Sequence, residues 1–292
     1  MPVNIIGQDK LKSYINNTSI DVFPHAILLC GQQGSGRHLM CQYIAETKGM
    51  IYCDVASIIG DNRLVTKSYT VDDLRKFIDS CYTTIDIRLL VIDSNDINNR
   101  EYPVLLKFLE EPPSNIFVVI IGENTECVIE TIRNRTRVLY MNEYTDQQLS
   151  LFVTDKDVYS ELFPDGITCK FASTPGQVQR LCSLGANSIQ ENRKLCTTIF
   201  TQIQNANYSN ILTISERFFP QTLDKFPFDV FLSLLIDELF NAMVGKLTNP
   251  IYFNAWMLTN HFLISIASNN NVNKKLKFEN YLFKLKGILQ GA

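Results

Sequence analysis

A glycine-rich loop between an apolar run and a helix-like segment is the feature that most constrains the fold of this chain. The loop reads Gly31-Gln32-Gln33-Gly34-Ser35-Gly36-Arg37-His38, and it follows the apolar residues 26–30 and precedes the helix-like residues 38–47. Its spacing is that of the phosphate-binding pattern G-x-x-x-x-G-K-[ST], and strand, glycine loop and helix is the context that gives this pattern meaning. The loop therefore predicts an α/β core of the P-loop type.

Two chemically important positions of the pattern are altered. Arg37 stands in place of the lysine, and His38 in place of the hydroxyl residue that binds Mg²⁺. The backbone N–H groups of such a loop attract anions whatever the side chains are, and a guanidinium binds phosphate oxygens well. Histidine is a poor substitute, because Mg²⁺ prefers oxygen ligands. Either ATP or ADP binds here without hydrolysis, or the loop is an empty glycine-rich turn.

Short apolar runs alternate with helix-like segments through the first half of the chain. Strands are expected at residues 26–30, 51–55, 89–93, 116–121 and 137–140, and helices at 71–80 and 101–110. Apolar strands that alternate with helices are typical of a parallel sheet covered on both faces. We therefore assign residues 1–142 to an α/β core.

The rest of the chain is expected to be helical. Residues 143–187 read as short helices, the last at 177–184, and form a predicted small helical domain. Residues 188–292 form a predicted all-α domain, with a helical apolar pattern over 230–244, a polar connector at 268–273 and a basic helix at 274–289.

Composition narrows the possible partners and the compartment. The formal net charge is −3 over 292 residues, so DNA contact requires a local patch or partner subunits. The eight cysteines include no C-x-x-C pair, which argues against a metal site and favours a reducing cytoplasm. We expect no signal peptide, and residues 251–267 are expected to form a buried helix rather than a membrane span, because polar residues interrupt them.

Two further segments could carry chemistry. Residues 89–93 form an apolar strand that ends in Asp93, the pattern in which an aspartate holds Mg²⁺, although an aspartate can also simply end a strand. The next residue, Ser94, cannot act as the base that a glutamate supplies there. Arg133, Arg135 and Arg137 alternate, and are either a solvated surface or a source of an arginine that acts on a neighbouring subunit's phosphates.

Taken in order, five segments resemble the clamp-loader branch of the AAA+ ATPases, and within it the delta-prime and gamma subunits of bacterial DNA polymerase III. The segments are residues 5–8, 24–29, 89–96, 105–113, which end in Glu-Glu-Pro-Pro, and 131–136. The resemblance covers roughly residues 1–185. It implies a RecA-like AAA+ core at 1–142, a helical lid at 143–187 and a helical collar at 188–292 that holds a five-subunit ring together.

The resemblance also implies roles and partners. Asn134-Arg135-Thr136 aligns with the family's Ser-Arg-Cys motif, which makes Arg135 the arginine finger in trans, although Arg133 stays open as an alternative. Residues 5–8 would lie near the adenine pocket. The implied partners are the other clamp-loader subunits, a sliding clamp and primer-template DNA, in the cytoplasm of a bacterium or of a virus-infected cell. The implied nucleotide-site residues are Gly31, Gly34, Ser35, Gly36, Arg37, His38 and Asp93.

Departures from the family pattern point to lost hydrolysis. The sensor at the end of the next strand falls at Gly122-Glu123, the second sensor falls near Gln177, and the four-cysteine zinc module is missing. Together with Arg37, His38 and Ser94, these changes favour a delta-prime-like stator without ATPase activity of its own. A gamma-like motor that uses Arg37 and a pure scaffold without a finger are the two alternatives.

Overall fold

The computed structural model describes residues 3–60, 71–97, 100–205, 212–213, 236, 241, 250–267 and 274–290. The chain divides into two compact units. Unit 1 comprises Met1–Leu149 and Ser173–Gln177, and unit 2 comprises Ser150–Ala172 and Val178–Ala292. The apolar pattern over 230–244 and the connector at 268–273 lie outside the described residues apart from two isolated positions.

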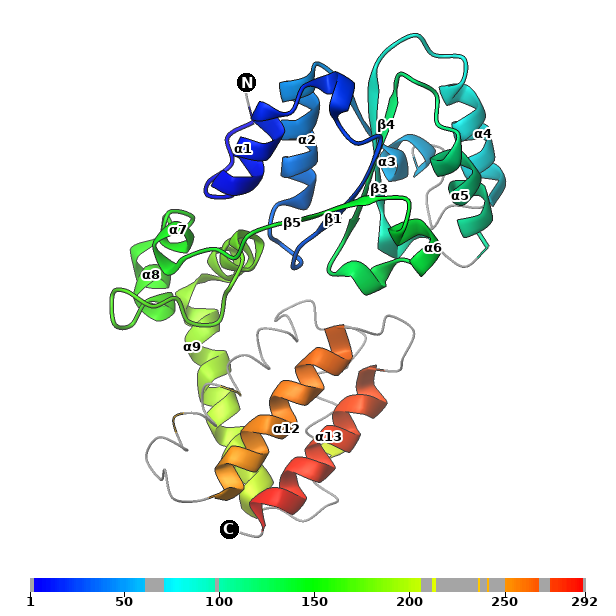
Figure 1. The fold of residues 1–292 in the computed structure, drawn as a ribbon. Coiled ribbons are helices and arrows are strands. Elements are labelled where there is room, and N and C mark those ends of the chain that lie inside the picture. Colours follow the sequence, from blue (N-terminus) through cyan, green and yellow to red (C-terminus); the bar gives the residue numbers. More distant parts are fainter. Residues whose placement is uncertain are drawn as a thin grey trace. The chain divides into compact units, whose positions relative to one another are not determined.

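Unit 1 is built on a five-stranded parallel sheet of order β2-β3-β4-β1-β5 (Figure 1). The strands are β1 (Ala26–Cys30), β2 (Ile51–Asp54), β3 (Arg88–Asp93), β4 (Ile116–Gly122) and β5 (Arg137–Tyr140). The five predicted strands are confirmed, with boundaries within one residue. The order was not predictable, because the sequence does not say that β1 lies between β4 and β5.

Helices cover both faces of this sheet, and alternate strand residues supply the two cores. On one face, Ile27 and Leu29 pack with residues of α1 (Asp9–Asn17) and α2 (Arg37–Lys48). On the other face, Leu28 and Leu90 pack with the helices after β2, β3 and β4. Those helices are α3 (Val55–Gly60), α4 (Val71–Cys81), α5 (Tyr102–Glu110) and α6 (Glu130–Arg133). This double burial explains why the three inner strands, β1, β3 and β4, are almost continuously apolar.

The regular elements that the structure describes in unit 2 are all helices. They are α8 (Lys156–Leu162), most of α9 (Pro175–Asn205), α12 (Pro250–Ala267) and α13 (Lys274–Leu289), whereas most of α7 (Asp146–Ser150) belongs to unit 1. The last two helices pack together through Phe262 and Tyr281, whose rings stack at 4.4 Å. Gly185 kinks α9 at the end of the helix predicted for 177–184. The collar role of this region stays a prediction.

Candidate functional site

The carboxyl ends of the strands bring the predicted site residues of unit 1 to one edge of the sheet. Cys30, the last residue of β1, lies beside Gly122 of β4 and Tyr140 of β5. Asp93, the last residue of β3, lies beside Ile121. In parallel α/β sheets this is the edge where ligands bind, next to the point at which the strand order reverses.

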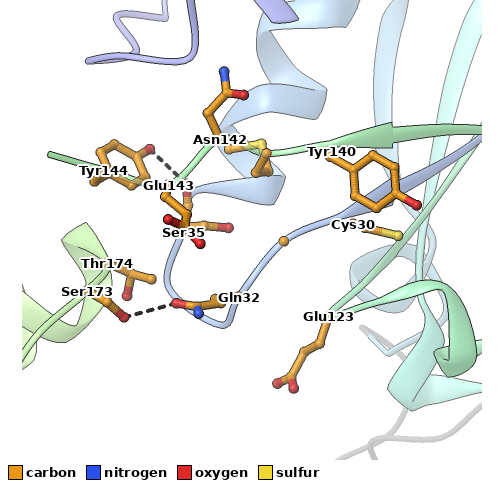
Figure 2. A pocket seen from close by; sticks show the side chains of 12 residues that line it. Cys30, Gln32, Ser35, Glu123, Tyr140, Asn142, Glu143, Tyr144, Ser173 and Thr174 are labelled. Carbon is orange, nitrogen blue, oxygen red and sulfur yellow. Dashed lines mark hydrogen bonds between the residues drawn. The ribbon is translucent and has the colours of Figure 1, made fainter.

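The glycine loop lies at this edge, and a distant segment of its own chain closes it. The Thr174 hydroxyl donates to the Gln33 carbonyl at 3.1 Å, and the Gly176 N–H donates to the Gly34 carbonyl at 2.9 Å. The Ser173 hydroxyl donates to Oε1 of Gln32 at 2.9 Å, and a dashed line marks this hydrogen bond in Figure 2. We call residues Ser173–Gln177 the closing segment, because it satisfies loop carbonyls without any ligand.

The loop and the closing segment meet backbone to backbone. A Cβ atom built on Gly176 would lie 2.6 Å from Cα of Gly34, closer than real atoms approach. Gly34 also has a φ of 83°, which a residue with a Cβ rarely adopts. Both glycines are therefore required by the contact. The sequence pattern explains Gly34 as part of the phosphate loop, but nothing in it indicates that Gly176 lies against Gly34.

Gln177, at the predicted second-sensor position, is used as a helix cap. Its side-chain oxygen accepts from the Ser173 N–H at 2.8 Å, and its own N–H lies 3.4 Å from the Thr174 hydroxyl. This is close to the reciprocal capping arrangement that begins many helices. A neutral amide engaged in this way cannot replace an arginine that reads a phosphate.

Arg37 is buried rather than presented to solvent. Its side chain belongs to a residue that is 9% exposed, and Nη1 has no hydrogen-bond partner among the described residues. Oγ of Ser35 is likewise buried without a partner. Both atoms are donors beside the N-terminus of α2, which is a favourable place for an anion. The loop therefore keeps the elements of an anion site while its carbonyls are held by the closing segment.

His38 occupies the magnesium-ligand position but faces β2. Its Nδ1 lies 3.3 Å from the Tyr52 hydroxyl and 3.9 Å from Oδ2 of Asp54. Asp54 in turn accepts from the Ala56 N–H at 3.1 Å at the start of α3. These contacts give His38 a structural role that needs no cation. No group of three or more His, Cys, Asp or Glu residues suited to a metal occurs among the residues that the structure describes.

The positions that would carry hydrolysis are filled by local packing. Asp93 accepts from both the N–H and the side-chain amide of Asn95, each at 2.9 Å, so it caps its own turn. Ser94 is 7% exposed. A Cβ on Gly122 would lie 2.0 Å from Sγ of Cys127 and 3.2 Å from Oγ of Ser94. A side chain at Gly122 would therefore have to displace the Cys127 thiol, and the second residue of the predicted sensor position, Glu123, lines the cavity beside the loop.

A cavity of about 180 Å³ lies beside the loop (Figure 2). Its lining residues are Cys30, Gly31, Gln32, Ser35, Glu123, Tyr140, Met141, Asn142, Glu143, Tyr144, Ser173 and Thr174. Two of these are carboxylates and none is a lysine or arginine, so the lining disfavours a polyphosphate. Burial, with a smaller contribution from Cys127, raises the pKa of the Cys30 thiol to about 11, so Cys30 is not a nucleophile near neutral pH.

The N-terminal segment predicted to lie near an adenine pocket makes a different contact. The Gln8 side chain donates to the Asn142 carbonyl at 2.8 Å and accepts from the Asn142 N–H at 2.6 Å. Gln8 is 3% exposed, and this exchange ties the start of the chain to the residues after β5. Its amide is therefore engaged with backbone and is not available to a base.

The three arginines of the predicted finger segment differ in their partners. Arg135 donates through Nη1 to the Thr131 carbonyl at 2.9 Å and through Nη2 to a carboxylate oxygen of Glu110. Nη2 of Arg133 lies 3.9 Å from the carboxylate of Glu130 in the same helix. Arg137 is exposed at the start of β5 and forms no ion pair with any described residue. The Glu110 contact could not be predicted, because 25 positions separate it from Arg135.

The predicted site residues thus fall into two groups within unit 1. The loop residues Gly31–His38 and Asp93 gather at the carboxyl edge of the sheet. Arg135 lies after α6 at a half-exposed position. The closing segment, Cys127 and Glu110 are the contacts that sequence reasoning missed.

The geometry defines a P-loop-type α/β protein, and the fold comparison agrees. The Thermotoga maritima RuvB Holliday junction branch migration motor aligns with 80% of this chain and 89% of its own, at a TM-score of 0.50 and 16% identity. This similarity shows a shared fold and nothing about activity. A DNA polymerase III gamma-subunit-related protein from the same organism aligns with 97% of this chain and all of its own, at 15% identity and a TM-score of 0.47.

Sequence comparison narrows the relationship. Residues 26–145 match the family model described as "DNA polymerase III, delta subunit". The DNA polymerase III gamma subunits of two Buchnera aphidicola strains, from Schizaphis graminum and Acyrthosiphon pisum, are 25% and 26% identical over 51% of this chain. The chain spans about half the length of these relatives, 47% in each case. These matches show similarity to DNA polymerase III subunits, and they name two different ones, delta and gamma.

None of the helices in the described part of the chain combines the length and the apolar character that a membrane span needs. The helix predicted for 251–267 is confirmed as α12, Pro250–Ala267, but it is not buried throughout, because Phe253 and Met257 are 49% and 39% exposed. The seven cysteines whose side chains are described are all free thiols.

Proposed function

We propose that this protein is a non-hydrolysing, delta-prime-like subunit of a replicative clamp loader. In this role it acts as a stator and supplies Arg135 to the nucleotide site of a neighbouring ATPase subunit. Its partners would be the other subunits of a ring-shaped, pentameric assembly, a sliding clamp and primer-template DNA. The net charge of −3 favours DNA contact that is shared across the assembly.

The observation that carries the proposal is the packing at the catalytic positions. Ser94 is buried, and the space at Gly122 is taken by the thiol of Cys127. Neither position can orient a water molecule for attack on a phosphate. The closing segment also contacts the loop directly, through hydrogen bonds to the Gln33 and Gly34 carbonyls. A chain with this packing has no hydrolytic chemistry of its own to supply.

Arg135 supports the second half of the proposal. Its side chain is 37% exposed, and among the described residues two of its five guanidinium N–H donors find an acceptor, which leaves three for a phosphate of another subunit. An arginine supplied in trans is worth roughly 10³–10⁵ in rate. The position of Arg135 therefore supports the proposed contact with a phosphate of a neighbouring subunit.

The experiment is steady-state ATP turnover by a ring assembled with the lysine-bearing clamp-loader ATPase encoded by the same genome, with primed DNA and clamp. We expect Arg135→Ala to lower the kcat of that ATPase roughly 10³-fold. Arg133→Ala is the matched control, and is expected to change kcat by less than about twofold, because an exposed pair such as Arg133–Glu130 contributes little. Full turnover with Arg135→Ala would rule out the finger role.

The gamma-like motor remains the second candidate, and the matched family descriptions favour it as much as the first. Its test uses the isolated chain. If that chain hydrolyses ATP and Asp93→Ala abolishes the activity, the stator proposal is wrong. We expect no turnover above background, because Asp93 is engaged by Asn95 and Ser94 is buried.

A further inference from the structure

The guanidinium of Arg135 is held by a part of the chain that lies far away in sequence. Glu110, the last residue of α5, binds Nη2 through its carboxylate, while the Thr131 carbonyl of α6 accepts from Nη1 at 2.9 Å. Both ends of the guanidinium fork are thus anchored. A side chain anchored at two points has far fewer rotamers than a free arginine.

The neighbouring arginines lack this arrangement. Arg133 meets only Glu130 of its own short helix, at 3.9 Å. Arg137 forms no ion pair with a residue that the structure describes. Of the three, Arg135 alone is held by a carboxylate from a separate element of the fold. This difference also favours Arg135 over Arg133 as the finger.

The Arg135–Glu110 ion pair contributes little to the free energy of unfolding, so stability alone does not explain it. The side chains of Arg135 and Glu110 are 37% and 50% exposed, and solvent screens such pairs strongly. Its remaining effect is to fix where the guanidinium sits. An arginine that acts on another subunit's phosphate loses less freedom on engagement if its rotamer is already fixed.

We propose that Glu110 is a positioning residue for Arg135, which orients the guanidinium for the nucleotide of the neighbouring subunit. This inference rests on the proposed function. Glu110 touches no phosphate itself and acts only through Arg135. Its negative charge opposes the approach of a phosphate, so the proposal requires that orientation outweighs this repulsion. Whether Glu110→Gln lowers or raises the kcat of the partner ATPase decides between orientation and repulsion.

The test is a kinetic analysis of the same assembled ring. We expect Glu110→Ala to lower the kcat of the partner ATPase about three- to tenfold, the loss that corresponds to one side chain no longer ordered in advance. The KM for ATP should stay unchanged, because the finger acts on the transition state rather than on substrate binding. Glu110→Gln, which keeps a carbonyl acceptor, is expected to fall between Glu110→Ala and the unsubstituted protein.

The matched control is Glu111→Ala, which removes the same charge from the next position. Glu111 is exposed, and its only described contact to a side chain, from the Tyr82 hydroxyl at 3.0 Å, uses its backbone carbonyl. The substitution therefore keeps that contact, and kcat should not change. The double variant Glu110→Ala/Arg135→Ala completes a cycle with the two single variants. It should turn over no more slowly than Arg135→Ala alone, because Glu110 acts only through that arginine.

The outcomes separate the two proposals. If Arg135→Ala has no effect, the proposed function is wrong and the positioning role falls with it. If Arg135→Ala slows the ring while Glu110→Ala does not, the positioning role is wrong and the function stands. A rise in kcat with Glu110→Gln would show that charge repulsion outweighs orientation, and a Glu110→Ala loss that persists in the Arg135→Ala background would show a general structural effect. Either result overturns the inference.

Discussion

The glycine loop (Gly31–His38) and the segment around Arg135 (residues 131–137), which we call the Arg135 surface, both belong to unit 1. Their arginines differ in burial and in hydrogen-bond partners. Arg37 is 9% exposed, with a guanidinium nitrogen that has no partner among the described residues, whereas the Arg135 side chain is 37% exposed and is anchored at two points. The loop is closed by its own chain, and the Arg135 surface keeps donors for another molecule. This contrast is the basis of the proposal that the chain does not catalyse at its own site and supplies Arg135 to a neighbour's site. The largest expected effect is therefore the roughly 10³-fold loss with Arg135→Ala.

The closed state of the loop depends on Gly176, and this dependence gives the largest stability effect. A Cβ at this position would meet the Gly34 backbone at 2.6 Å, and backbone cannot move aside as a side-chain tip can. We expect Gly176→Ala to lower the free energy of unfolding by about 2–3 kcal/mol, as overpacking does. Urea denaturation of the whole chain, followed by circular dichroism, measures it.

The matched control for this change is Gly287→Ala in α13. No atom lies within 4 Å of the added Cβ, and alanine is the better helix former, so stability should rise by up to about 1 kcal/mol. An equal response of the two glycines would contradict the idea that the closing segment holds the loop tightly.

A substitution at Gly122, in the predicted sensor position, is expected to have a smaller effect on the free energy of unfolding. Gly122→Ala places a Cβ 2.0 Å from the Cys127 thiol, but that thiol is the end of a side chain and can rotate away. We expect a loss of about 1–2 kcal/mol in the free energy of unfolding. The variant Gly122→Ala/Cys127→Ala should recover part of this loss in the same urea experiment. A loss of the same size with and without Cys127 would show that the thiol does not fill this space.

Replacing Arg37, whose guanidinium is buried, is expected to have the smallest effect on the free energy of unfolding. Unlike Gly176→Ala and Gly122→Ala, it is not expected to destabilise the protein. Arg37→Met keeps an unbranched side chain and removes a buried donor that has no partner among the described residues. Because an unsatisfied buried polar group costs about 1–3 kcal/mol, the variant should be as stable as the parent or up to about 1 kcal/mol more stable. Thermal unfolding checks this. A marked fall in stability would show that Arg37 holds the loop and would weaken the contrast with Arg135.

Local patterns predicted much of unit 1. The apolar run at 26–30, the glycine spacing after it and the aspartate at the end of 89–93 are short-range signals, and each lies where the sequence places it. Such signals work because period, length and turn residues depend on the chain nearby. The same is true of the helices at 250–267 and 274–289.

Contacts between distant residues could not be predicted in this way. Thr174 and Gln33 are 141 positions apart, and so are the hydrogen-bonded side chains of Ser173 and Gln32. Nothing local marks Thr174-Pro175-Gly176 as the partner of the glycine loop, although a threonine and a glycine around a proline do mark a helix start. The order of the strands was unpredictable for the same reason.

The sequence alone determined that this chain builds a parallel α/β core with an altered phosphate loop. Apolar periodicity and glycine spacing are properties of short segments of the chain, so they can be recognised without the tertiary structure. It also showed that Arg37 and His38 replace the lysine and the hydroxyl residue of the phosphate-loop pattern, and that Ser94 replaces the glutamate expected after Asp93. Only the tertiary structure decided what those replacements do. Folding buries Arg37, closes the loop with residues 173–177 and anchors Arg135 on Glu110, and these outcomes depend on which distant surfaces the sheet brings together.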